Sequence, residues 1–348
     1  MRAGTSSLRH LVFPLSLAGA VFLVYVWDRV AIPTELVELQ RVFGLSLAAA
    51  GLLASVFTFG LALSAILSGF VVMRIGTRLS LVIGAISFSL CTAHAAIGHG
   101  YADLLVARIG TGVGEGLYDV AFLSLLAYLS EKYRAASEGV GASLFGIGLF
   151  SGPLFVGGLM TASGHWQTAF YTLGALGVLG GIGMLLTLRN EQFAIAAVKR
   201  GPVTFGRLKN VLVARNLGVC LAMAVTGSAL YAYVSRYQAY LRIDQHMAAG
   251  TAYWIASMFG IGSILGGVPI GYIADRFGRR HFLPIIMVIS GVTGVAIFAV
   301  PATPVVAGIL SLILGTSVNG IVANAYAVIQ DQVDPIDIQL ATGVLTTI

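Results

Sequence analysis

The chain has 348 residues, of which 57% are hydrophobic and only 10% are charged, and its formal net charge is +6. Soluble domains carry about 25% charged residues, so this composition excludes an ordinary soluble protein. The positive residues are spread over separate short segments between apolar runs. This spread argues against a nucleic-acid partner, which would need a concentrated basic surface.

Long apolar runs recur along the whole chain. A run of about 18 or more apolar residues predicts a transmembrane helix. Ten such runs occur, and 338–348 is expected to begin an eleventh; the ten cover 11–27, 44–72, 79–98, 109–129, 139–164, 167–188, 211–235, 247–273, 282–300 and 304–329. The sequence therefore predicts an all-α polytopic membrane protein.

Charged residues lie within or directly beside two of these runs. The stretch ARIGTGVGEGLYDVAF (107–122) contains Arg108, Glu115 and Asp119, and Asp28 and Arg29 follow the first run. A charge near the bilayer centre costs a few kcal/mol on insertion scales, so such residues are functional candidates. At 100° per residue the three charges of 107–122 lie within roughly 40° around a helix, along about 16 Å of its axis. We expect this shared stripe to face a bundle interior or a cavity.

The chain also contains an internal repeat. The loop GFVVMRIGTR (69–78) recurs as GYIADRFGRR (271–280), and GTGVGEG (110–116) recurs as GTSVNGI (315–321). Two parallel halves would explain both pairs: 1–188 with six spans, and 211–348 with four spans and the start of a fifth, joined by a basic linker at 189–210. Such repeats are typical of secondary transporters. Most Lys and Arg residues fall on one side of the membrane, which predicts a cytoplasmic N-terminus in the inner membrane.

GYIADRFGRR is similar to the signature loop of the major facilitator superfamily, Gly-xxx-Asp-Arg-x-Gly-Arg-Arg. GFVVMRIGTR is a degenerate copy, with Met73 where the Asp is expected. The resemblance implies a fold of two six-helix repeats and a conformational latch in which Asp275 and Arg276 keep the family's pairing. Arg74 and Arg78 have the alternative role of simple positive-inside anchors. The expected latch residues are Gly69, Arg74, Gly76, Arg78, Gly271, Asp275, Arg276, Gly278 and Arg279.

Three stretches resemble the anion:cation symporter group of that superfamily, which includes sugar-acid and organic-anion transporters. They are YVWDRVAIP (25–33), FGLSLAAAGLLASVFTFG (43–60) and RIGTGVGEG (108–116). The resemblance implies that the matching Asp and Glu positions are protonation sites and that the Arg positions act on substrate and coupling. Ala31 replaces the group's usual Asn and Leu61 a frequent pore-facing Tyr, so the contacts of those two groups do not carry over.

Side-chain chemistry assigns the same roles. A guanidinium stays charged and binds carboxylates bidentately, so Arg29 and Arg108 suit an anionic substrate. A carboxyl that is partly removed from water can exchange a proton near neutral pH, which makes Asp28 and Glu115 candidates for proton coupling. Asp119 is a weaker candidate without support from the resemblance.

Each assignment has a structural alternative. Asp28 and Arg29 could form an ordinary pair at the outer interface, and Arg108 could snorkel outward. Glu115 and Asp119 could be structural. Asn319 and Asn324 in the tenth run could bind a substrate hydroxyl or form an interhelical hydrogen bond.

The sequence thus predicts a monomeric, proton-coupled symporter of a small organic anion that works by alternating access, and not an enzyme. No Cys or His spacing indicates a cofactor or metal. One alternative is a proton-antiport exporter of drugs or metabolites, because the fifth run approximates the superfamily's helix-5 glycine–proline motif. Another is a non-transporting truncated protein, since a twelve-helix fold would need about 50 more residues after Ile348. The motif residues are Gly139, Gly148, Gly152, Pro153, Gly157 and Gly158.

Overall fold

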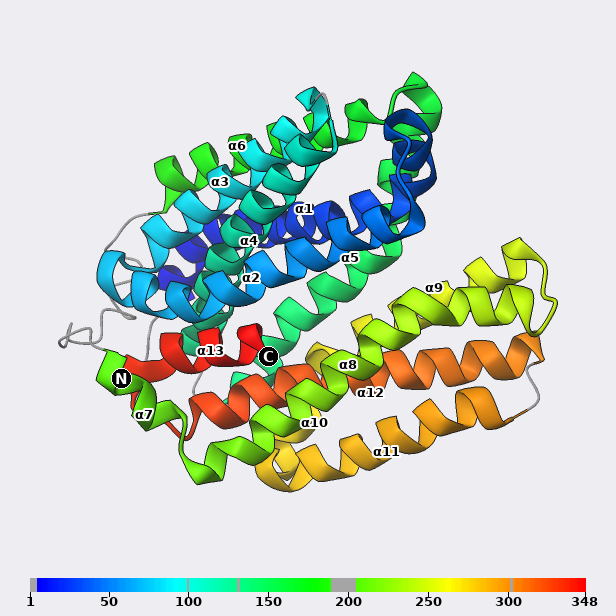
Figure 1. The fold of residues 1–348 in the computed structure, drawn as a ribbon. Coiled ribbons are helices and arrows are strands. Elements are labelled where there is room, and N and C mark those ends of the chain that lie inside the picture. Colours follow the sequence, from blue (N-terminus) through cyan, green and yellow to red (C-terminus); the bar gives the residue numbers. More distant parts are fainter. Residues whose placement is uncertain (1–4, 99, 130–131, 189–204, 301–302) are drawn as a thin grey trace. The chain divides into compact units, whose positions relative to one another are not determined.

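The computed structural model describes residues 5–98, 100–129, 132–188, 205–300 and 303–348. The regular elements among these residues are all helices (Figure 1). Most of the expected linker, 189–204, lies outside the described residues. The helices are α1 (Thr5–Phe43), α2 (Leu47–Ile75), α3 (Thr77–Ile97), α4 (Tyr101–Leu129), α5 (Arg134–Ser163), α6 (Gln167–Thr187), α7 (Leu208–Val211), α8 (Ala214–Ile243), α9 (Ala249–Gly266), α10 (Val268–Phe277), α11 (Arg279–Ala299), α12 (Pro304–Gln330) and α13 (Ile338–Thr347), with 3₁₀ turns η3 (Phe205–Arg207) and η4 (Pro335–Asp337).

Nine segments of the described chain are long and apolar enough to cross a membrane, and Ala214–Leu230 of α8 is a shorter apolar stretch. The prediction of an all-helical polytopic protein is confirmed. Several predicted boundaries are wrong, and three of them bear on the site or on the packing of the helices. α1 continues past residue 27 to Phe43, α4 begins at Tyr101 and not at 109, and the run 247–273 is divided between α9 and α10 at Gly267.

The division at Gly267 has a local cause. Pro269 has no backbone N–H to continue the ladder of α9, so a new helix starts around it. The freed N–H of Val268 donates to Ser143 Oγ of α5 at 3.2 Å. A side chain from α5 thus replaces the missing helical hydrogen bond.

Contacts divide the chain into two compact units. The first contains Met1–Leu125, Ser151–Arg207 and Pro335–Thr347, and the second contains Leu126–Phe150 and Leu208–Asp334. The two parts of α5 therefore belong to different units, and α13 belongs to the first. The division into sequential halves 1–188 and 211–348 stays a prediction.

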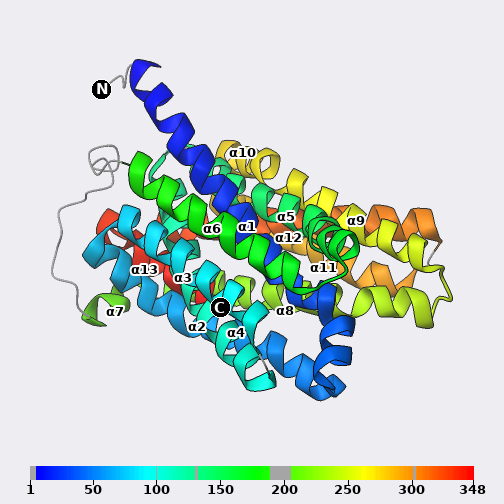
Figure 2. The ribbon, with the colours of Figure 1, turned by 90° about the horizontal axis from the view of Figure 1, so that it is seen from above.

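Small residues set the packing of the first unit. α3 lies along α6 (Figure 1), and α1 runs against α6 (Figure 2). At the contact of α4 with α2, a Cβ added to Gly112 would lie 2.9 Å from Leu61 N, and one added to Gly116 would lie at the same distance from Leu61 O. Glycines spaced four apart let two helix backbones approach closely in a membrane. This approach brings the side chains of α2 beside the charged stripe of α4.

The second unit is built around α12, which packs on α9 and α11 (Figure 1). A Cβ added to Gly315 of α12 would meet the carbonyl oxygen of Phe259 and lie 3.0 Å from Ser263 N. Stacked aromatic side chains of α8 and α9 fill the core beside this contact, with Tyr233 lying 4.7 Å from Tyr237 and 4.6 Å from Phe259 between ring centroids.

We expect Gly315→Ala to destabilise the protein by about 1–3 kcal/mol, because the added methyl group overlaps the backbone of α9. Gly294→Ala on α11 is the matched control: nothing lies within 4 Å of its added Cβ. There the change should be neutral or slightly stabilising, since alanine favours helix more than glycine does. Thermal unfolding of both variants in detergent measures the difference, and equal midpoints would contradict the packing described.

Candidate functional site

Four charged side chains of α1 and α4 form two crossed ion pairs inside the first unit. Arg108 Nη1 lies 3.3 Å from Asp28 Oδ2, and Arg29 Nε lies 3.0 Å from Glu115 Oε2. Asp28 and Glu115 are fully buried and Arg108 is 3% exposed. Adjacent helical residues point about 100° apart, so Asp28 and Arg29 each pair with α4 and not with each other.

This pairing corrects two sequence-based alternatives. Asp28 and Arg29 are not a pair at the end of a span, because the membrane-crossing segment of α1 extends from Phe13 to Glu35. Arg108 does not snorkel outward, because its guanidinium contacts a buried carboxylate. The helix can continue through both charges because each has an opposite charge within reach.

Three further side chains contact these charges. Thr92 Oγ1 of α3 donates to Asp28 Oδ1 at 2.9 Å. Arg29 donates to the hydroxyl of Tyr25 and lies 4.4 Å from the centre of its ring. The ring of Phe57 on α2 lies 4.2 Å from Arg108 Cζ and 5.8 Å from Arg29 Cζ.

Sequence reasoning assigned no role to these three residues. Tyr25 could have been found, because residues four apart meet on a helix surface and position 25 precedes Arg29 by four. Thr92 and Phe57 come from other helices, and no spacing in the sequence connects them to the charges.

One carboxyl oxygen of the cluster lacks a donor. Among the described residues no N–H or O–H group reaches Glu115 Oε1, and the Glu115 side chain also interacts with the carboxyl group of Asp28. Asp119, one turn further along α4, is buried, interacts electrostatically with Arg29 and hydrogen-bonds Tyr25 and Thr346. Three carboxyl groups thus surround two guanidinium groups.

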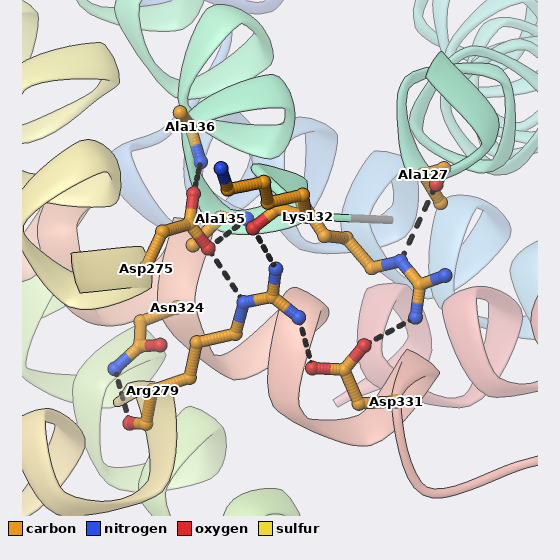
Figure 3. Close-up of polar contacts among 9 residues, drawn as sticks. Ala127, Lys132, Ala135, Ala136, Asp275, Arg279, Asn324 and Asp331 are labelled. Carbon is orange, nitrogen blue, oxygen red and sulfur yellow. Dashed lines mark hydrogen bonds and ion pairs between the residues drawn. The ribbon is translucent and has the colours of Figure 1, made fainter. Parts of the chain in front are cut away.

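A second charged network lies in the second unit (Figure 3). The carboxylate of Asp275 accepts hydrogen bonds from the backbone N–H groups of Ala135 at 3.1 Å and Ala136 at 2.9 Å, at the start of α5. Arg279 Nε lies 2.6 Å from the same carboxylate. Arg279 also pairs with Asp331, which pairs with Arg134. The network connects the first turn of α5 to α10, α11 and the end of α12.

The network corrects the expected pairing of the signature loop. The partner of Asp275 is Arg279, and Arg276 is exposed. Asn324 Nδ2 donates to the carbonyl oxygen of Arg279 at 2.9 Å, which is the interhelical hydrogen bond that the sequence left open. Asn319 lies apart from it, buried on α12 against Gly266 of α9.

Two glycines of the signature loops adopt the backbone conformation that the turns between helices require. Gly76 between α2 and α3 has φ +87°, and Gly278 between α10 and α11 has φ +93°, a backbone conformation that favours glycine. Gly271 is a contact glycine, because its added Cβ would lie 2.9 Å from Ala136 Cα of α5.

The first copy of the loop makes fewer polar contacts. A Cβ added to Gly69 would lie 2.8 Å from the carbonyl oxygen of Gln339, so α2 approaches α13 closely there. Arg78 donates to the carbonyl oxygen of Leu185 at 2.6 Å, while Arg74 is exposed. Met73 supplies no carboxylate to repeat the role of Asp275.

Comparison with known proteins supports the class of protein that the sequence predicts. A family model described as Major Facilitator Superfamily matches residues 17–348. The chain is 24% identical to the probable L-galactonate transporter of Escherichia coli (strain K12) over 276 residues, covering 74% of this chain and 60% of that protein. It is 28% identical to the quinolone resistance protein NorA of Staphylococcus aureus over 173 residues, covering 49% of this chain and 44% of that protein. The chain thus spans less than two thirds of either relative.

A solved structure shares the fold. The proton:xylose symporter XylE bound to 6-bromo-6-deoxy-D-glucose has a TM-score of 0.72 and 17% sequence identity, covering 96% of this chain and 84% of that chain.

We expect Asp28→Asn to lower the free energy of unfolding by about 3–5 kcal/mol, because it leaves the charge of Arg108 buried without its partner. Adding Arg108→Gln should recover much of that loss. Arg276→Gln, at an exposed position, is the control and should stay within about 0.5 kcal/mol. Unfolding in detergent measures all four proteins. A double variant no more stable than Asp28→Asn alone would show that the two side chains do not depend on each other.

Proposed function

Because the chain belongs to the major facilitator superfamily, we propose that it is a secondary active transporter carrying a small organic anion together with protons by alternating access. The family makes it a multi-pass membrane transporter and not an enzyme. The observation that carries the finer proposal is the pair of crossed ion pairs on α1 and α4. Both cations suited to an anionic substrate are already held by carboxylates of the protein.

Competition for these cations couples proton to substrate. A substrate carboxylate and Glu115 require the same guanidinium, that of Arg29. Protonation removes the charge of Glu115 and weakens its hold on Arg29, which can then bind the incoming anion. Proton and anion therefore favour the same state of the site, which is the thermodynamic requirement for symport. In the same scheme, protonation of Asp28 would weaken its hold on Arg108 and leave that guanidinium to bind the anion.

Glu115 is the proposed first proton acceptor. Its Oε1 lacks a donor among the described residues, and its side chain interacts with the Asp28 carboxyl. A proton on Oε1 would create an O–H group that can donate to Asp28, so protonation satisfies a buried acceptor as well as releasing Arg29. Asp119 is the second candidate proton acceptor, because it also interacts with Arg29.

A sugar acid is the proposed substrate class. The E. coli relative is named a probable L-galactonate transporter, and a sugar acid combines a carboxylate for Arg29 or Arg108 with several hydroxyl groups. Asn319 remains a candidate for one hydroxyl, whereas the hydrogen bond of Asn324 to Arg279 favours a structural role. The distribution of basic residues favours a cytoplasmic N-terminus in the inner membrane. A monomeric state stays a prediction.

The network of Asp275, Arg279, Asp331 and Arg134 is the proposed conformational latch. The side chain of Asp331 is 30% exposed. Water can therefore replace its contacts with Arg134 and Arg279 when the helices separate. Asp275 also faces the first N–H groups of α5, where the helix dipole favours a negative charge. The contacts of Asp331 are the part of the network that water can reach, as a reversible latch requires.

An exporter is the second candidate. The relative NorA is named a quinolone resistance protein, and α5 approximates the glycine–proline motif. Gly152 of this stretch packs against α1, where its added Cβ would lie 3.2 Å from the Trp27 ring. Transport of neutral or cationic compounds that is unaffected by Arg108→Ala would favour export over anion symport.

A reconstituted uptake assay tests the proposed function. Liposomes containing the protein would be screened with L-galactonate and other sugar acids, with and without an inward proton gradient. We expect uptake that rises with the gradient. Failure of every sugar acid to enter would overturn the substrate class, and uptake indifferent to the gradient would overturn proton coupling.

Glu115→Gln should abolish gradient-driven uptake while leaving counterflow exchange measurable. Glutamine resembles the protonated acid but cannot take up and release a proton during the transport cycle. Asp103→Asn provides the matched control, since this acid lies in the first turn of the same helix and not among the site charges. It should retain gradient-driven uptake. Normal accumulation by Glu115→Gln would remove Glu115 from the coupling mechanism.

A further inference from the structure

The ring of Phe57 contacts both guanidinium groups of the site. Its centre lies 4.2 Å from Arg108 Cζ and 5.8 Å from Arg29 Cζ, both within the range of a cation–π interaction. The Phe57 side chain is 7% exposed. It is thus a buried neutral group shared by two cations that pair with separate carboxylates, and for Arg29 it adds to the contact with the Tyr25 ring.

Close helix packing holds this ring in place. The backbone of α2 at Phe57 touches α4 at Gly112, and a Cβ added to Gly60 would lie 2.9 Å from the carbonyl oxygen of Ile109. Because α4 has glycine at 112 and 116, α2 lies directly against the helix that carries Arg108 and Glu115. The backbone that carries the ring is therefore held next to the arginine-bearing helix.

We propose that Phe57 is a positioning residue that keeps Arg108 and Arg29 in their binding positions when their carboxylate partners are protonated. A buried guanidinium that loses its counter-ion needs another favourable contact, and a ring face supplies one through its quadrupole. Unlike a carboxylate, the ring leaves the positive charge uncancelled. Phe57 therefore holds the cations without competing with the substrate anion. This inference rests on the anion site proposed above.

Transport kinetics give the first test. Phe57→Leu removes the ring but keeps an apolar side chain of similar size, and Phe57→Tyr keeps the ring. For L-galactonate uptake we expect Phe57→Leu to raise KM by about 3- to 30-fold with a smaller change in kcat, the range that a buried cation–π contact corresponds to. Phe57→Tyr should stay within about twofold of the wild type. Phe59→Leu is the control on the same helix, because Phe59 is 66% exposed.

Unchanged KM in Phe57→Leu, or equal losses in Phe57→Leu and Phe57→Tyr, would overturn the proposal, since the ring face would then have no special role. Gel filtration in detergent must show that each variant is folded before its kinetics are compared.

A second test needs no substrate. The shift in unfolding midpoint caused by Phe57→Leu would be measured in the wild type and in Arg108→Gln. We expect a smaller shift in Arg108→Gln, because the ring then has lost its nearer cation, whereas identical shifts would overturn the contact. If no sugar acid is transported by the wild type, the proposed function fails. The comparison of unfolding midpoints then decides the role of Phe57 by itself.

Discussion

The need to neutralise buried charge determines the organisation of the first unit. A charged side chain taken out of water is tolerated only with an opposite charge and good hydrogen bonds close by. Asp28 and Arg29 meet that condition through α4, and Arg108 and Glu115 meet it through α1. The crossed pairs therefore fix the rotation of α1 and α4 about their own axes. Thr92 and Phe57 then add contacts from α3 and α2.

Hydropathy predicted most helices because burial in lipid requires long apolar runs, but it failed where charges are satisfied by tertiary contacts. The first run appeared to end at Asp28, and the fourth appeared to begin after Arg108, since a hydropathy pattern contains no information about partners on another helix. α1 continues to Phe43 and α4 begins at Tyr101. The break at Gly267 was missed for the opposite reason, because the residues on both sides are apolar.

Helical periodicity predicted the shared stripe of Arg108, Glu115 and Asp119, and the structure brings all three toward Arg29 and Asp28. The partner of each charge could not be predicted, because that depends on the rotation and height of α1 against α4. The same limit applies to the signature loop. Its pattern drew attention to Asp275, but only the fold shows that Arg279 and the first turn of α5 are its partners.

The choice of residue types fits the proposed response of the site to protons alone. Arginine keeps its charge when buried, whereas a buried lysine can lose its proton and would add a second titrating group. With both cations permanently charged, the proposed proton sites are the carboxyl groups of the cluster. An aromatic ring beside the arginines does not titrate either. In the proposed mechanism, each proton taken up by a carboxyl adds one positive charge to the cluster, and that charge offsets one negative charge of an incoming anion.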